Sequence, residues 1–247
     1  MKKFALLEVM LIFTGAEFLI WNFDLLNSQI RLSGWASAAL LINLVIYSWH
    51  KNEYLESKSF YLRHAKLNGN EIPLEKIQKL SRETAFSKLG ILPTNWKKDL
   101  KLLTASTFLL WLVILIVALI WNPQFLNQKD LAWKFFKHLF LYFPWALLQN
   151  LLLNGYFASR LSLAIKNPKA VSAVSGLLFA IIHLPNPVLF PATLIGGIMS
   201  AHFFQRNRNL YALAAGHALL AVTLLYFFPD SWHHHLRIGP GFYFYKN

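Results

Sequence analysis

The sequence predicts an all-α polytopic membrane protein with about seven transmembrane helices. Hydrophobic residues make up 56% of its 247 positions and charged residues only 14%, and the mean hydropathy is +0.40. A chain this apolar differs from an average soluble domain. The apolar residues also gather in seven runs of 14 to 27 residues, and most of these runs have the length of roughly 17 to 25 that crosses a bilayer as a helix. Cysteine is absent, which excludes disulfides, thiol nucleophiles and Cys-ligated zinc.

Seven apolar runs are the candidate spans, and the fifth is the shortest. They extend from Phe4 to Phe23, Leu32 to Trp49, Leu102 to Trp121, Phe135 to Leu161, Val171 to Leu184, Val188 to Phe204 and Leu210 to Phe228. The first run follows two lysines, as in a signal peptide, but Glu8 and Glu17 interrupt it and no small-residue cleavage site follows. We therefore expect a retained helix.

Five regions follow from these runs. They are two N-terminal spans (1–49), a basic cytoplasmic or interfacial segment (50–101), the third span with its loop (102–131), a core of four spans (132–228) and an external tail (229–247). The second region is mixed in charge and contains turn signals such as Asn68-Gly69-Asn70 and Pro73, so it predicts a loop with one or two short helices. It is either an interfacial helix that helps to present a substrate or a solvated connector on the headgroups.

The net charge of +13 is explained by topology rather than by nucleic-acid binding. With the N-terminus inside, 18 of the 24 Lys and Arg residues fall on one side of the membrane and six on the other. This asymmetry follows the positive-inside rule, so we expect a cytoplasmic N-terminus and an external C-terminus. The basic excess would then attract anionic lipid headgroups. Arg160, near the inner surface in this topology, is expected to extend to those headgroups.

Polar residues within three of the runs mark the candidate site. His183 and His217 lie in apolar runs, and the amides Gln149, Asn150 and Asn154 lie in another. Such residues are unfavourable in hydrocarbon, so they usually face a bundle interior or a working site. Positions four apart share a helix face, which places Asn150 over Asn154. The three helices could therefore present these side chains to one cavity.

The order and context of these motifs resemble the CPBP family of intramembrane proteases, the relatives of CAAX prenyl endopeptidases. The carrying residues are Phe179-x-x-x-His183 with Leu184-Pro185, then His217-Ala218-Leu219, preceded by a segment that ends in Gly155-Tyr156. The family pattern is Glu-Glu-x-x-x-Arg, Phe-x-x-x-His, then His-x-x-x-Asn or Asp. The resemblance covers roughly residues 132–228.

The chain departs from that pattern at the acidic pair. Gln149 and Asn150 occupy the glutamate positions, Asn154 that of the arginine, and Ala221 that of the last Asn or Asp. In the family, the first glutamate activates the water, and the histidines orient it, bind a metal or stabilise the oxyanion. A carboxamide cannot accept the proton. Two alternatives remain open: His183 or His217 takes the proton, or a metal lowers the pKa of the water. Gln149 would then position the water.

A divalent metal such as zinc is a possible cofactor, with His183 and His217 as its ligands. Catalytic zinc usually has three protein ligands, whereas the resemblance supplies two imidazoles and no carboxylate. Asn150 or Asn154 would be a weak third ligand. The amides could also be simple hydrogen-bonding contacts between helices.

The leading hypothesis is an intramembrane endopeptidase that hydrolyses a peptide bond in or near the membrane, with water activation centred on His183 and His217. Its substrate would be a membrane-embedded or lipidated protein or peptide, and its expected location is a bacterial cytoplasmic membrane. The alternative is a catalytically silent scaffold or chaperone that binds a transmembrane or lipidated partner. A transport pathway ranks last, because the sequence has no inverted repeat. The tail, with His233-His234-His235, is expected to form an ordered loop that caps the site.

Overall fold

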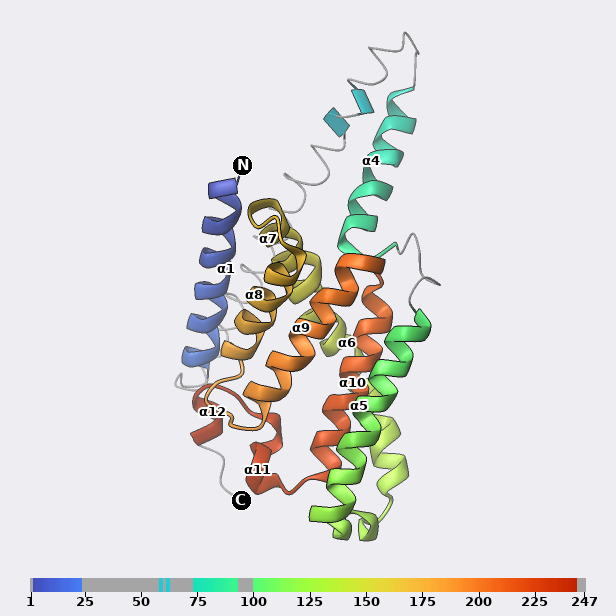
Figure 1. The fold of residues 1–247 in the computed structure, drawn as a ribbon, viewed down its shortest axis with the longest axis vertical. Helices are drawn as coiled ribbons and strands as arrows, with labels where there is room; N and C mark the ends of the chain where they lie inside the picture. Colours follow the sequence, from blue (N-terminus) through green and yellow to red (C-terminus); the bar gives the residue numbers. More distant parts are fainter. Residues whose placement is uncertain (1, 24–57, 60, 63–72, 93–99, 244–247) are drawn as a thin grey trace.

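The computed structural model describes residues 2–23, 58–59, 61–62, 73–92 and 100–243, and this part of the chain is helical without strands (Figure 1). The all-α prediction is therefore confirmed over these residues. The elements are α1 (Lys2–Phe23), α4 (Leu74–Leu89), α5 (Leu100–Trp121), η2 (Pro123–Asn127), α6 (Leu131–Asn150), η3 (Leu151–Ala158), α7 (Ser159–Ala164), α8 (Pro168–Ile181), α9 (Leu189–Asn207), α10 (Leu210–Phe227), α11 (Asp230–His233), η4 (His234–Leu236) and α12 (Pro240–Tyr243).

Six of the seven apolar runs coincide with helices, and the second, Leu32 to Trp49, lies outside the described residues. Within the described ranges, α5 and α10 are long and apolar enough to cross a membrane, and α8 is a shorter apolar helix. The α5 helix leaves most of its apolar surface exposed, as expected of a surface in contact with lipid. The count of seven spans remains a prediction.

A π-helical segment interrupts the predicted fourth span. The chain is helical from α6 through η3 to α7, but η3 has π rather than α geometry. Single π turns inside α-helices are rare and are frequent at functional sites. The η3 segment carries Asn154, and its last six residues are buried. Because these residues are buried, η3 lies in the interior of the bundle.

The α8 and α9 helices pack closely because two glycines meet at their contact. A Cβ atom on Gly197 would lie 3.0 Å from the Cα of Gly176. Gly176 and Gly197 are the two residues that make this close approach. Gly196 instead faces open space. Small residues at such contacts let helix backbones approach in membrane proteins.

The α10 helix packs between α5 and α6. Alanines form the contact with α6, where Ala146, Ala214 and Ala218 are buried together. On the α5 side, the Trp111 indole Nε1 donates a hydrogen bond of 3.0 Å to the Thr223 hydroxyl. These contacts fix the face of α10 that carries His217.

The sequence analysis predicted that Arg160 extends to the lipid headgroups, but in the structure it points into the protein. Its side chain is buried, and its Nε lies 3.8 Å from Oε1 of Glu8 on α1. The α1 helix packs along α7 and contributes Val9 and Ile12 to a core with Phe157. Because a buried guanidinium requires a charged or polar partner, Glu8 supplies the contact that the sequence analysis assigned to lipid.

The α4 helix and the C-terminal tail lie at opposite ends of the bundle (Figure 1). The helix predicted in the basic segment is α4, which ends at Gly90 in the left-handed conformation (φ 78°). Leu89 at its end packs against Gly155 of η3. The tail forms α11, η4 and α12.

Candidate active site

One cavity of about 750 Å³ lies between α5, α6, α9 and α10 and beneath the tail. Four of the five predicted site residues line it: Gln149, Asn150, His183 and His217. The fifth, Asn154, is fully buried behind Asn150. The cavity wall is mainly apolar, with few polar side chains converging on it, as is usual for ligand sites.

The two histidines share one aromatic neighbour. The Phe179 ring meets the His183 ring at a centroid distance of 4.7 Å and the His217 ring at 5.8 Å, both edge to face. Tyr142 of α6 also borders the cavity, and its ring centroid lies 6.1 Å from that of His217. Phe179, predicted only as part of a motif, thus packs against both imidazoles and limits their rotation.

His183 presents a basic nitrogen to the cavity. Its Nδ1 lies 2.7 Å from the backbone carbonyl oxygen of Phe179. A carbonyl oxygen can only accept, so Nδ1 carries the proton in the neutral ring. The other nitrogen, Nε2, is then unprotonated and can accept a proton or a hydrogen bond. His183 therefore has the tautomer that a general base needs.

The contact with Asn150 favours the opposite tautomer in His217, with the proton on Nε2. The Asn150 Nδ2 group donates to the carbonyl oxygen of Ala146 at 2.9 Å and lies 3.1 Å from Nδ1 of His217. The carbonyl requires the NH₂ end of the amide at this place, so the second N–H points to His217 and Nδ1 must accept it. The neutral His217 ring then carries its proton on Nε2. One histidine offers an acceptor and the other a donor.

Gln149 lines the cavity as the sequence predicted. Within the described part of the chain, its buried Oε1 atom has no hydrogen-bond partner. Buried polar atoms in native proteins nearly always have a partner, whether protein or ordered water. This oxygen is therefore available to a water or to a substrate N–H group in the cavity.

Ser200 is a polar residue of the site that the sequence analysis missed. Its hydroxyl donates to Oδ1 of Asn150 at 3.1 Å and accepts from Nδ2 of Asn154 at 2.8 Å. The signal that could have revealed it is the pair of small residues Gly196 and Ser200, which share a face of α9. Tyr142, also missed, has no motif that distinguishes it from the other aromatic residues of its run.

The donor set does not fit a catalytic metal. Zinc bound at Nε2 of His217 would require the ring proton on Nδ1, where it would face the Asn150 N–H group. Within the described ranges, no three His, Asp or Glu side chains lie close enough to hold an ion together. The predicted role of His183 and His217 as metal ligands therefore lacks the third donor and the tautomer that it needs.

The tail covers the cavity and is held there by Asn186. Residues 235–238 and Gly241 contribute to the cavity wall. Asn186 donates to the carbonyl oxygens of His233 and Arg237 at 2.8 and 3.0 Å, while its Oδ1 accepts from the backbone N–H groups of Val188 and Leu189. All four hydrogen-bonding positions of this buried amide are thus used.

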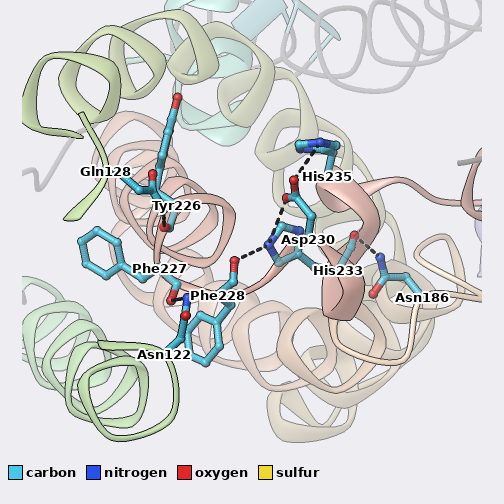
Figure 2. A network of polar contacts seen from close by, with 9 residues as sticks. All are labelled: Asn122, Gln128, Asn186, Tyr226, Phe227, Phe228, Asp230, His233 and His235. Atoms are coloured by element: carbon cyan, nitrogen blue, oxygen red, sulfur yellow. Dashed lines mark hydrogen bonds and ion pairs between the residues drawn. The ribbon is translucent and has the colours of Figure 1, made fainter. Parts of the chain in front are cut away.

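The junction between α10 and the tail is also tied by side chains (Figure 2). Three carbonyl oxygens at the end of α10 accept from side chains: Phe227 from Asn122, Tyr226 from Gln128, and Phe228 from the His233 ring. Asp230 lies 3.0 Å from Nε2 of His235. Helix ends leave carbonyls without internal partners, and these contacts satisfy them. His234, His235 and Leu236 all have positive φ values, which is strained for such residues.

Comparisons with known proteins agree with the resemblance seen in the sequence. Residues 104–223 match the family described as type II CAAX prenyl endopeptidase Rce1-like. This segment runs from α5 to α10 and contains Gln149, Asn150, Asn154, His183 and His217. No curated protein and no solved structure matched the chain. The match over residues 104–223 confirms that the chain resembles the CPBP intramembrane proteases, to which the Rce1-like endopeptidases are related.

Proposed function

We propose that the protein is an intramembrane endopeptidase that hydrolyses a peptide bond of a membrane-embedded or lipidated substrate. The observation that carries this proposal is the pair of histidines with opposite hydrogen-bonding roles in one apolar cavity. A protease family matches the segment that holds them. Hydrolysis requires both roles: a base for the water and a donor for the oxygen that becomes negatively charged.

In the proposed reaction, Nε2 of His183 takes a proton from a water molecule while the water oxygen attacks the scissile carbonyl carbon. The carbonyl oxygen becomes an oxyanion and accepts a hydrogen bond from Nε2–H of His217. His183 then transfers its proton to the amide nitrogen as the C–N bond breaks, leaving a carboxylic acid and an amine, between which a proton then redistributes. Gln149 Oε1, which has no partner among the described residues, accepts a hydrogen bond from the attacking water and orients it. No metal takes part in this scheme.

The surroundings support a membrane-bound reaction. We propose seven spans, a cytoplasmic N-terminus and an external C-terminus in a bacterial cytoplasmic membrane, on the basis of the apolar runs and the distribution of Lys and Arg. The tail then covers the cavity from the external side. An apolar wall would accept an apolar substrate segment or a lipid group, and lipid surrounds the remaining surface.

A second candidate is a catalytically silent scaffold that binds a transmembrane or lipidated partner in the same cavity. The observation that favours it is the complete replacement of the acidic pair by Gln149 and Asn150, with Asn150 engaged in four internal contacts. Loss of a general base commonly lowers a rate by about 10² to 10⁴. The two candidates differ in whether any peptide bond is cut.

A cleavage screen in proteoliposomes tests the proposal. Purified protein would be incubated with a library of transmembrane and lipidated peptides, and new termini would be identified by mass spectrometry. We expect cleavage by the wild type and none by the double variant His183→Ala/His217→Ala. The control is His202→Ala, a histidine of α9 that does not line the cavity. Binding of a peptide without cleavage by any of these proteins would favour the scaffold.

A further inference from the structure

Ser200 completes a polar network at the cavity wall that neither the family match nor the sequence motifs assign. We define the amide–hydroxyl network as Asn150, Asn154 and Ser200. Asn154 Nδ2 donates to Oδ1 of Asn150 at 2.9 Å and to the Ser200 hydroxyl at 2.8 Å, and Ser200 donates onward to the same Oδ1 at 3.1 Å. The three residues come from α6, η3 and α9.

The direction of each bond in this network is determined. The Ala146 carbonyl accepts from Nδ2 of Asn150, so the opposite end of that amide must be its oxygen. That oxygen accepts from both Asn154 and Ser200. A rotated Asn150 amide would direct its oxygen at the Ala146 carbonyl and its N–H groups at two donors. The contacts with the Ala146 carbonyl and with Nδ2 of Asn154 would then become unfavourable, because buried polar groups need complementary partners.

The two hydrogen bonds that Oδ1 of Asn150 accepts also orient the Nδ2 group of the same amide. They hold the carboxamide plane so that the remaining N–H of Nδ2 points at Nδ1 of His217, 3.1 Å away. Networks of hydrogen bonds in a low-dielectric interior reinforce one another. Loss of the Ser200 hydroxyl would leave Asn150 with one donor on its oxygen and let the amide plane tilt away from the imidazole.

We propose that Ser200 is a positioning residue that acts through Asn150 to keep His217 protonated on Nε2, and so to keep a hydrogen-bond donor directed into the cavity. This inference rests on the proposed function for its kinetic consequence, but the state of the His217 ring is independent of catalysis. Ser200 does not accept or donate the transferred proton. Its contribution is the orientation of the donor that stabilises the oxyanion.

The primary test is ¹⁵N NMR of the histidine side chains, with the protein in lipid nanodiscs and His217 assigned by comparison with a His217→Gln sample. Chemical shifts of the two ring nitrogens distinguish the Nε2–H from the Nδ1–H tautomer. The samples are the wild type, Ser200→Ala, Ser200→Thr and Asn150→Ala. Ser172→Ala is the matched control, because Ser172 is a buried serine of α8 bonded to Gln205 and absent from the cavity wall.

We expect the Nε2–H tautomer in the wild type, in Ser200→Thr and in Ser172→Ala, and a mixture of tautomers in Ser200→Ala and Asn150→Ala. With a cleavable peptide, Ser200→Ala should lower kcat about 10-fold with little change in KM, because one lost hydrogen bond of about 1.4 kcal/mol corresponds to a factor of ten. An Nδ1–H tautomer in the wild type, or no change of tautomer in Ser200→Ala, would overturn the inference whether or not the protein cuts peptides. Absence of cleavage with the expected tautomers would contradict only the proposed function.

Discussion

The Asn150 amide nitrogen lies 3.1 Å from Nδ1 of His217, and this contact determines what the histidine offers to the cavity. An asparagine at this position donates to Nδ1, whereas a carboxylate could only accept from it. Asn150 therefore determines the tautomer of His217, whose neutral ring carries its proton on Nε2. The chain retains two histidines but uses them as an acceptor and a donor.

Gln149→Glu should increase cleavage if Gln149 orients the attacking water. A glutamate at this place could accept the proton itself, and a positioned general base contributes about 10² to 10⁴ in rate. We expect kcat/KM for a library-derived peptide to rise by about 10-fold or more. Gln124→Glu, at an exposed position in η2, controls for the added negative charge. An unchanged or lower rate in Gln149→Glu would argue that Oε1 does not contact the water.

Asn186→Ala should loosen the tail. The substitution removes two donors from the carbonyls of His233 and Arg237 and two acceptor contacts from the start of α9. Leaving a buried group without its partner commonly destabilises by about 1 to 3 kcal/mol. Hydrogen–deuterium exchange should therefore accelerate in residues 229–243 and leave α10 unchanged.

The control for this experiment is Asn122→Ala, which breaks one bond to the carbonyl of Phe227 at the same end of the bundle. Its effect should be confined to the end of α10. Equal exchange of the tail in Asn186→Ala and wild type would contradict the assignment of Asn186 as the residue that holds the tail in place.

Acid should destabilise the tail through His233. Burial lowers the pKa of His233 below its ordinary value of 6.5, and the hydrogen bond to the Phe228 carbonyl and the nearby Asp230 offset this in part. The facing titratable groups are Asp230, His234 and His235. The unfolded chain binds the proton more readily than the folded one. The contribution of neutral His233 to the free energy of unfolding is therefore complete above about pH 6.5. It decreases as the pH falls from that value towards the lower pKa of the folded protein.

Thermal unfolding in detergent at about pH 7.5 and about pH 5.5 measures this effect. His233→Gln keeps an N–H donor for the Phe228 carbonyl but does not titrate. We expect the Tm of the wild type to fall further on acidification than the Tm of His233→Gln. The same loss in both proteins would assign the acid sensitivity to other groups.

Sequence reasoning located most of the site because buried polar residues are conspicuous in apolar runs. His183, His217, Gln149 and Asn150 all line the cavity. Ser200 escaped notice because a serine in an apolar helix commonly bonds to its own backbone. The packing of α9 against α6 and η3 brings its hydroxyl to Asn150 and Asn154.

Two other features depend on contacts that a linear pattern does not contain. The π geometry of η3 leaves no mark in the apolar run that contains it, because all its residues except Asn154 continue that run. The pairing of Arg160 with Glu8 joins α7 to α1, helices far apart in the chain. Local hydropathy predicted lipid contact for Arg160, and tertiary packing placed it inside the protein.

Isotope incorporation during cleavage is the most direct measurement of the central claim that His183 activates a water for peptide-bond hydrolysis. Wild-type protein, His183→Ala and His202→Ala would cut the best library peptide in H₂¹⁸O, and mass spectrometry would follow ¹⁸O in the new carboxyl terminus. We predict incorporation by the wild type and His202→Ala, and a rate lower by about 10² or more in His183→Ala. Equal rates of incorporation in His183→Ala and the wild type would contradict the account.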